Sequence, residues 1–243
     1  MNIGIIPARL DSKRFPKKIL APLNGKPMVA NTVERSLMAK KLDRVILAID
    51  SRETKDALKG YGFEMVMTSK EHSSGTDRIA EVARDIKDAN IIINIQGDEP
   101  LIDPNHIDKV IKWHNKNRSF DIVIPSLKSK DIDTKHIVKI VKNKKKILYF
   151  SRAKVPFPFK KKNYFFNKHL SIISFKPNVL KKFRSLPEST LEKIEGIEMM
   201  RALENEMKLG TFELKGNSFS VDTSDDYFKA REYMTKDRWR KRY

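Results

Sequence analysis

The chain has 243 residues, of which 40% are hydrophobic and 33% are charged, with 9 Gly, 11 Pro and no Cys. This composition excludes a disordered chain, a fibrous repeat, disulfides and thiolate metal sites. Lys and Arg number 50 against 31 Asp and Glu, which gives a formal net charge of +19 and favours an anionic partner. The lysines are spread along the chain without a recognisable nucleic-acid motif, so we expect an anionic small substrate and no nucleic acid.

Localisation follows from the hydropathy pattern. No apolar run approaches the roughly 20 residues that a membrane-spanning helix needs, and we expect no membrane segment. The start, MNIGIIPAR, has an apolar stretch before its first basic residue and no small-residue cleavage site, which is the reverse of a secretory signal. We therefore expect a cytoplasmic protein.

In the first half, short apolar strands alternate with amphipathic helices. The periodicity predicts strands at 2–6, 45–49, 63–67, 90–95 and 121–126, and helices at 28–40, 53–59, 76–86 and around 107–114. Such alternation predicts an α/β fold, with a mostly parallel sheet flanked by helices on both faces.

The pattern changes after residue 130. Strands are predicted at 137–141, 147–150 and 170–175 around a Pro/Phe/Lys-rich loop at 155–162, then a helix at 191–207, strands at 211–214 and 219–221, and a helix at 224–234 before a basic tail at 235–243. Thr223, with Asp226 three residues later, predicts the N-cap of that last helix. We expect a single domain over 1–243 with a β-rich insertion at about 130–190.

Basic residues follow the first predicted strand. The loop from Pro7 to Lys18 holds five cations within ten residues and lies just before a helix. Ligands of open α/β sheets bind at the carboxyl ends of strands, and clustered cations suit a polyphosphate. The loop is neither a P-loop nor a Rossmann loop, because it lacks their glycines. A solvated basic loop is the alternative.

Two carboxylates are candidate ligands of Mg²⁺. Asp98 follows the most apolar strand beside Gly97, and Asp222 lies at a later strand-to-helix junction. Mg²⁺ takes one or two protein carboxylates and leaves its other positions to phosphate and water. A turn carboxylate that caps the next helix is the alternative for Asp98, and an N-cap is the alternative for Asp222.

Two further segments carry polar groups. HSSGTDR at 72–78 precedes a predicted helix, where small residues let a ligand approach the backbone and Ser74 or Thr76 could cap the helix. Glu198 shares a predicted helix face with Leu191 and Ile194, which directs its carboxylate toward the sheet. A substrate hydroxyl or an arginine would then be its partner, the latter in a structural salt bridge.

Taken together, these segments resemble the CMP-Kdo synthetases, the cytidylyltransferases that activate 3-deoxy-manno-octulosonate (Kdo). The resemblance rests on IPARLDSKRFPKKIL with NGKPM (ending at 28), HSSGTDR (72–78), NIQGDEPLI (94–102), YFSRAKVPF (149–157), His169, LEKIEGIEMMR (191–201) and VDT (221–223). It implies a GT-A-like, Rossmann-type fold, a homodimer formed through the β-rich insertion, and conversion of CTP and Kdo to CMP-Kdo and diphosphate for lipopolysaccharide or capsule synthesis.

The resemblance also implies a role for each matching residue. CTP would be bound by Ala8, Arg9, Ser12, Lys18, Gly75, Thr76 and Arg78. The sugar would be bound by Gln96, Arg152, His169 and Glu198. Asp98 and Asp222 would hold Mg²⁺ and, with Arg9 and Lys18, would form the catalytic set.

Three positions depart from the family pattern. Lys17 replaces a glycine of the phosphate loop, Ile173 replaces a tyrosine and Met199 replaces a glutamine. The last two changes remove polar groups from the sugar side, so a modified Kdo or another acidic 3-deoxy sugar remains an option. The alternatives are a cytidylyltransferase for a nine-carbon acidic sugar and, from a different class, a nucleic-acid-binding module that uses the +19 charge.

Overall fold

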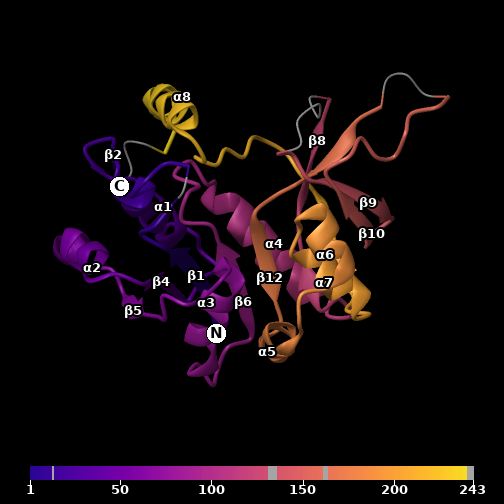
Figure 1. Cartoon of the computed structure of the whole chain (residues 1–243), viewed down its shortest axis with the longest axis horizontal. Coiled ribbons are helices and arrows are strands. Elements are labelled where there is room, and N and C mark those ends of the chain that lie inside the picture. Colours follow the sequence, from indigo (N-terminus) through magenta and orange to yellow (C-terminus); the bar gives the residue numbers. More distant parts are fainter. Residues whose placement is uncertain (13, 131–135, 161–163, 240–243) are drawn as a thin grey trace. The chain divides into compact units, whose positions relative to one another are not determined.

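The computed structural model describes residues 1–12, 14–130, 136–160 and 164–239. The chain divides into two compact units, the first formed by Met1–Ile111 with Ser218–Tyr243 and the second by Lys112–Asn217 (Figure 1). The expected organisation as one domain with an insertion at about 130–190 stays a prediction.

The first unit is built on a parallel sheet with the strand order β6-β1-β4-β5. Its strands are β1 (Asn2–Ala8), β4 (Arg44–Ile49), β5 (Met65–Met67) and β6 (Ile91–Ile95). β1 pairs in parallel with both β4 and β6, and β5 pairs in parallel with β4. Their apolar residues are almost entirely buried, as expected for strands covered on both faces. The predicted parallel sheet is confirmed.

Helices accompany these strands. They are α1 (Met28–Leu37), α2 (Arg52–Leu58), α3 (Gly75–Arg84) and α8 (Ser224–Thr235), with short elements η1 (Lys18–Leu20), η2 (Lys59–Tyr61), β2 (Pro22–Leu23) and β3 (Lys26–Pro27). α4 (Pro104–Lys116) begins in the first unit and ends in the second. α1 and α3 pack against β1 and β4. Val29 and Val33 of α1 are buried, whereas Leu37, expected on the same face, is 56% exposed where the helix ends.

The segment from residue 218 onward completes the core of the first unit. Val221, Ala230 and Met234 form a buried cluster with Leu23 and Met28. This packing fixes α8 against the region that follows the basic loop. The strand predicted at 219–221 is wrong, because this stretch has no ladder pairing beyond a single hydrogen bond from the Val221 N–H to the Asp98 carbonyl (2.9 Å).

The second unit is mostly antiparallel. Its strands are β7 (Ile122–Val123), β8 (Ser126–Ser129), β9 (Lys139–Asn143), β10 (Lys146–Ser151), β11 (Phe166–His169), β12 (Ile172–Phe175), β13 (Leu209–Gly210) and β14 (Glu213–Leu214). β9 pairs with β10 and β11, and β11 pairs with β8, all antiparallel. The β-rich character predicted for this stretch agrees with β9–β12. Residues 161 and 162 of the predicted loop and residues 240–243 of the predicted tail lie outside the described residues.

Several predicted boundaries in this unit are wrong for identifiable reasons. The strand predicted at 121–126 divides into β7 and β8 at Pro125, which lacks a backbone donor. The helix predicted at 191–207 divides into α6 (Thr190–Glu195) and α7 (Met199–Glu204), because Gly196 adopts a left-handed conformation with φ 61°. α5 (Pro177–Ser185), with Pro177 in its first turn, was not predicted. None of the described helices is long and apolar enough to cross a membrane.

Candidate active site

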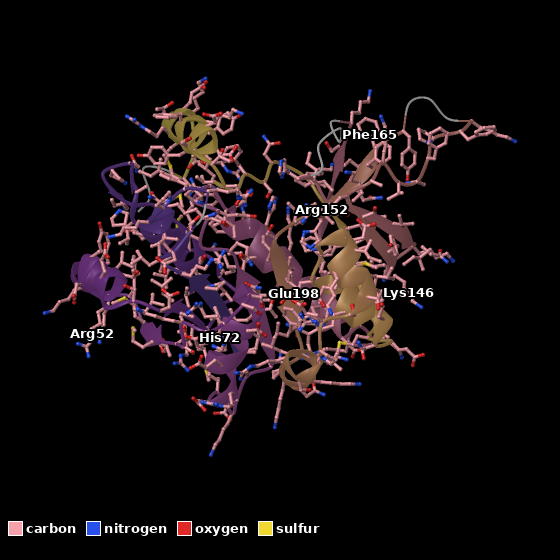
Figure 2. The ribbon with its side chains drawn as sticks, viewed as in Figure 1. Arg52, His72, Lys146, Arg152, Phe165 and Glu198 are labelled. Carbon is pink, nitrogen blue, oxygen red and sulfur yellow. The ribbon has the colours of Figure 1, made fainter. Side chains whose placement is uncertain are left out.

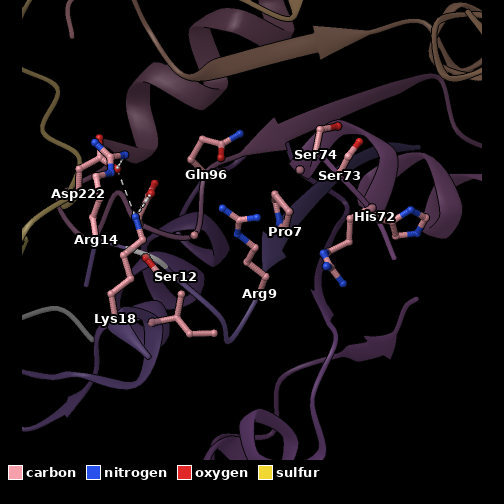
Figure 3. Close-up of a pocket in the computed structure, with 15 residues that line it drawn as sticks. Pro7, Arg9, Ser12, Arg14, Lys18, His72, Ser73, Ser74, Gln96 and Asp222 are labelled. Carbon is pink, nitrogen blue, oxygen red and sulfur yellow. Dashed lines mark hydrogen bonds and ion pairs between the residues drawn. The ribbon is translucent and has the colours of Figure 1, made fainter. Parts of the chain in front are cut away.

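A cavity of about 510 Å³ opens in the first unit at the carboxyl ends of β1 and β6 (Figure 3). It is lined by Pro7, Arg9, Ser12, Arg14, Lys18, Ile19, His72, Ser73, Ser74, Gly75, Arg78, Gln96, Gly97, Asp98 and Asp222. Four of these side chains are Arg or Lys and two are carboxylates. Such a lining suits a ligand that carries several negative charges.

The two predicted metal ligands meet at Lys18. The Lys18 Nζ lies 2.5 Å from Asp98 Oδ2 and 3.4 Å from Asp222 Oδ1, and it donates to the Val221 carbonyl at 2.9 Å. Arg14 Nη2 contacts Asp222 Oδ1 at 2.8 Å. The three contacts of Lys18 match the three donors of an ammonium group. The structure therefore brings Asp98 and Asp222 to one point, and Figure 3 shows Lys18 reaching toward Asp222 beside Arg14.

Asp222 is not the N-cap of α8, which was the alternative reading of this residue. Thr223 occupies that position, and its Oγ1 accepts from the Asp226 N–H at 3.2 Å. Asp226 accepts in return from the backbone N–H groups of Thr223 and Asp222. Burial raises the pKa of Asp226, but the hydrogen bond from the Thr223 hydroxyl and those from the two backbone N–H groups outweigh burial and lower it. The charged cap holds the backbone of Asp222 and leaves the Asp222 carboxylate for the pocket.

Lys17 adopts a left-handed backbone conformation with φ 52°. Its Nζ lies 2.7 Å from a Glu53 carboxylate oxygen at the start of α2. The family pattern has a glycine at this position, and glycine takes such a conformation without steric cost. Lys17 therefore holds a conformation that a glycine would adopt at lower cost, and its charge is paired with Glu53.

Arg78 forms a buried ion pair that was not expected. Its guanidinium contacts Asp50 Oδ2 at 3.0 Å and the Ser69 carbonyl at 3.2 Å, and Asp50 Oδ1 accepts from the Leu10 N–H at 3.0 Å. Burial lowers the pKa of Arg78, while the Asp50 charge raises it and the neighbouring Arg9 charge lowers it. Asp50 thus neutralises Arg78 and fixes the backbone immediately after Arg9.

The start of α3 forms the far end of the pocket from Asp222 (Figure 3). The Ser74 side chain caps this helix by accepting from the Asp77 N–H at 3.1 Å. His72 Nε2 contacts Glu81 in the same helix. A Cβ at Gly75 would lie 3.2 Å from Pro7 Cγ, so a larger residue would crowd the pocket wall. Free N–H groups at a helix start attract anionic or polar ligand atoms.

A glycine lets the carboxyl ends of β1 and β6 lie close together. A Cβ at Gly97 would lie 2.8 Å from the Pro7 carbonyl oxygen, which real structures do not tolerate. Gln96, directly before it, donates to Asn94 Oδ1 at 3.2 Å and lines the pocket. Gly97 therefore sets how near Asp98 comes to the basic loop.

The other sugar-side residues belong to the second unit, where Figure 2 labels Arg152 and Glu198. Arg152 donates to the carbonyls of Glu195 (2.8 Å) and Gly196 (3.0 Å) at the end of α6. His169 packs edge-on against Phe150. Burial and the charges of Arg152 and Lys168 lower the pKa of His169 to about 4, so it is neutral at pH 7.

Glu198 was expected to share one helix face with Leu191 and Ile194. This prediction is wrong, because the helix divides at Gly196. Ile194 is 73% exposed, which contradicts its predicted place toward the sheet. Glu198 instead precedes the first turn of α7. Ile173 and Met199, which stand where the family has polar groups, are both buried.

The predicted residues thus fall into three groups. One group lines the pocket: Arg9, Ser12, Lys18, Gly75, Arg78, Gln96, Asp98 and Asp222. Ala8 and Thr76 are buried and are not among the lining residues. Arg152, His169 and Glu198 lie in the second unit. The sequence analysis included Arg14 and His72 in candidate segments without giving either a role of its own, and it missed Asp50, although Asp50, like Asp98, directly follows an apolar strand.

The pocket offers a divalent cation two carboxylates, so a bound ligand would have to supply further oxygen atoms. Within the described ranges, no three or more His, Cys, Asp or Glu side chains converge as a metal-binding group. Two carboxylates directed at one point, as in Asp98 and Asp222, are the protein contribution that Mg²⁺ uses when phosphate oxygens complete its shell. The donor set therefore suits Mg²⁺ bound together with a nucleotide.

The sequence and the fold are both similar to those of known proteins. The family model described as "Cytidylyltransferase" matches residues 3–209. A 3-deoxy-manno-octulosonate cytidylyltransferase of Trichlorobacter lovleyi is 39% identical, over 96% of this chain and 98% of its own length. The chain belongs to the cytidylyltransferase family.

Two more proteins similar to this cytidylyltransferase are named for Kdo-type sugars. An 8-amino-3,8-dideoxy-manno-octulosonate cytidylyltransferase of Shewanella sp. (strain ANA-3) is 38% identical over 98% of this chain and all of its own length. A solved structure of a CMP:2-keto-3-deoxy-manno-octonic acid synthetase complexed with CTP matches with a TM-score of 0.93 and 32% identity, covering 97% of this chain and 98% of that one. The GT-A-like fold expected from the resemblance is confirmed, and so is membership of the Kdo cytidylyltransferase group.

Proposed function

We propose that this enzyme transfers a cytidylyl group from CTP to an acidic 3-deoxy-octulosonate sugar and releases diphosphate. The observation that carries the proposal is the meeting of Asp98, Asp222 and Lys18 in a pocket with a cationic lining. Full-length similarity to enzymes named for Kdo-type sugars supports the choice of substrates.

The reaction needs one bond to form and one to break. The anomeric hydroxyl oxygen of the sugar attacks the α-phosphorus of CTP, and the bond from that phosphorus to the oxygen bridging to the β-phosphate breaks. The hydroxyl proton passes to solvent, and diphosphate leaves. Catalysis then comes from aligning the two substrates and from neutralising the charge on phosphate oxygens. Arg9 and Lys18 would stabilise the departing diphosphate.

Asp98 and Asp222 would hold Mg²⁺, which supplies Lewis-acid stabilisation of phosphate oxygens when it is bound. Gln96, which lines the pocket, would face the sugar. The sugar-binding roles that the resemblance gives to Arg152, His169 and Glu198 stay predictions. The resemblance gives the cytidine side to Gly75, Thr76 and Arg78, of which Gly75 and Arg78 line the pocket. No side-chain nucleophile is required by this chemistry.

The test uses purified protein, CTP, Mg²⁺ and three sugars, namely Kdo, its 8-amino-8-deoxy analogue and a nine-carbon acidic sugar. Diphosphate release is followed with each. We expect turnover with at least one octulosonate and little with the nine-carbon sugar. Absence of diphosphate release with both octulosonates would refute the proposal. Tight, sequence-tolerant DNA binding at physiological salt would instead support the nucleic-acid module.

The choice between the two octulosonates is tested at Ile173 and Met199. Relatives of both names are 38–39% identical to this chain, so overall identity does not separate the two sugars. If Ile173 and Met199 select a modified sugar, Ile173→Tyr with Met199→Gln should shift preference toward Kdo by about 1–3 kcal/mol per contact regained. An unchanged ratio of kcat/KM for the two sugars would show that these positions do not select the substrate.

We also infer that the protein is a cytoplasmic homodimer in which the second unit forms the contact. Phe157 and Phe159 are 76% and 84% exposed, and grouped exposed aromatics mark an interaction surface. Light scattering after gel filtration should give twice the chain mass for the wild type and a monomer for Phe157→Ser with Phe159→Ser. A wild-type monomer at micromolar concentration would exclude this assembly. A role in lipopolysaccharide or capsule synthesis follows from the product.

A further inference from the structure

Lys18 occupies the position between the two carboxylates to which a divalent cation would bind. Its side chain is only 13% exposed, and its ammonium contacts Asp98, Asp222 and the Val221 carbonyl. Arg14 adds a second cation at Asp222. In the nucleotide-free protein, the carboxylate pair is therefore already bound by the protein's own positive charges.

Charge balance decides what can enter this cluster. Asp98 and Asp222 contribute −2, and Lys18 and Arg14 contribute +2, so the sum is zero. Adding Mg²⁺ alone would place two more positive charges beside an ammonium that has little contact with water. Like charges a few ångströms apart, partly screened from solvent, repel strongly. A triphosphate removes the conflict, because its oxygens offer Lys18 and Arg14 new anionic partners.

Lys18 can make this exchange without a change of fold. Its ammonium ends a flexible four-carbon stem, and it begins η1 directly beside the pocket. Its neighbour Lys17 is directed elsewhere, with its Nζ 2.7 Å from a Glu53 carboxylate oxygen. The two adjacent lysines thus have different partners and provide a matched comparison.

We propose that Lys18 is a displaceable counter-cation of the metal site, which holds Asp98 and Asp222 together in the free enzyme and yields them to a divalent cation only when a nucleotide triphosphate arrives. This inference rests on the proposed function and specifies the order of binding. The free enzyme binds divalent cations weakly, the nucleotide and the metal enter together, and the carboxylates are kept in place without a bound metal.

The experiment measures Mn²⁺ binding to nucleotide-free protein through the loss of the electron paramagnetic resonance signal of free Mn²⁺. Wild type, Lys18→Met and Lys17→Met are titrated side by side after treatment with a chelator. Both variants remove one positive charge, and only Lys18→Met removes it from the carboxylate pair. We expect the dissociation constant for Mn²⁺ to fall by about tenfold or more in Lys18→Met. It should stay within about twofold of wild type in Lys17→Met.

Two further measurements make the result specific. Adding Asp98→Asn to Lys18→Met should abolish the gain in Mn²⁺ affinity, because one of the two carboxylates is lost. Adding CTP to the wild type should lower the dissociation constant for Mn²⁺ below the value measured for CTP without protein. Thermal unfolding verifies that each variant is folded, and Lys18→Gln replaces Lys18→Met if the latter is not.

Equal Mn²⁺ affinity of the free wild type and the Lys18 variants would overturn the inference, as would an equal gain in Lys17→Met. These outcomes are separable from the proposed function. An enzyme that releases diphosphate with Kdo but shows no gain in Mn²⁺ affinity refutes the counter-cation role alone. A gain in affinity in a protein without turnover refutes the proposed reaction and leaves Lys18 as the counter-cation of the carboxylate pair.

Discussion

At the scale of single residues, the site depends on which charges face one another. Lys18, Asp98 and Asp222 come from three distant parts of the chain and meet within hydrogen-bond range. The side chain of Asp98 is 23% exposed and that of Asp222 is 38% exposed, so a ligand can reach both. Substitutions here should act on the reaction rather than on folding.

Asp98→Asn should keep the protein folded and reduce kcat by several orders of magnitude, because it removes a metal-binding charge while keeping the side-chain shape. Asp222→Asn should behave similarly, and the double variant should be little worse than either single one, since residues that act as a unit are not additive. Steady-state diphosphate release measures all three. Asp225→Asn, at an exposed carboxylate in the first turn of α8, is the matched control. Strictly multiplicative losses would indicate separate roles.

Lys17 offers a test of backbone strain. Lys17→Gly and Lys17→Ala both lose the exposed ion pair with Glu53, whereas only alanine retains the steric cost of the positive φ. The glycine variant should therefore have a free energy of unfolding about 1 kcal/mol higher than the alanine variant. Urea denaturation of both proteins measures the difference. Equal stabilities would mean that position 17 relaxes out of the left-handed region.

Site residues could be predicted from the sequence where neighbouring residues in the chain alone decide their position. Asp98 was placed at a sheet edge by the apolar strand and the glycine before it. The contact of Lys18 with both carboxylates was not predictable, because it depends on where the segment after residue 218 returns in space. The conformation of Lys17 was also hidden, since nothing in a lysine indicates a positive φ. Asp50 was predictable by the rule that found Asp98, a carboxylate directly after an apolar strand.

At the scale of elements, helix boundaries and buried polar groups decide how the second unit is held together. The division between α6 and α7 escaped the periodicity analysis, because the apolar pattern continues through Gly196 while the backbone does not. His114, near the end of α4, is fully buried. Its Nε2 contacts the Phe120 carbonyl at 3.2 Å, and its Nδ1 lies 2.6 Å from Ser174 Oγ. The carbonyl can only accept, so the neutral ring carries its proton on Nε2.

This histidine predicts a loss of stability in mild acid. Burial, with the charges of Arg118 and Lys176, lowers the pKa of His114 to about 4, although the Phe120 carbonyl acts in the opposite direction. The unfolded chain, with a histidine pKa near 6.5, therefore binds more protons between these values, and stability falls as the pH drops below about 6.5. His114 alone should reduce the free energy of unfolding by about 2 kcal/mol between pH 7 and pH 5.

The measurement is urea denaturation at both pH values for wild type and His114→Gln. Glutamine can still donate to the Phe120 carbonyl and accept from Ser174, and it does not titrate. The variant should lose about 2 kcal/mol less than wild type between pH 7 and pH 5. An identical loss in both proteins would assign the acid sensitivity to other groups, such as His169.

At the scale of the whole molecule, the net charge of +19 acts on every anionic ligand that approaches. Both proposed substrates are anions, and a positive field raises their rate of capture. Most of the lysines lie outside the pocket, so the long-range field and the local cations are separable contributions. Salt screens the first more strongly than the second.

kcat/KM for CTP should therefore fall several-fold between 50 and 500 mM salt, values chosen to span the Debye lengths over which surface charge is screened. Arg9→Gln should lower kcat/KM at all salt concentrations and leave most of the salt dependence in place, because Arg9 lines the pocket and is screened less than the surface charges. Lys181→Gln, at an exposed position on α5 with the same change of charge, is the control and should leave both nearly unchanged. A kcat/KM that is independent of salt in the wild type would show that steering is absent.

The return of the chain to the first unit has a consequence for biosynthesis. Lys18 and Asp98 are translated before the second unit, at residues 112–217, and Asp222 is translated after it. A nascent chain that has emerged up to residue 217 lacks Asp222, and Leu23 and Met28 lack Val221, Ala230 and Met234, which cover them in the finished protein. Such an intermediate exposes apolar surface that a chaperone can hold. It also has only one of the two carboxylates, so the nucleotide site stays incomplete until the last segment of the chain has emerged from the ribosome.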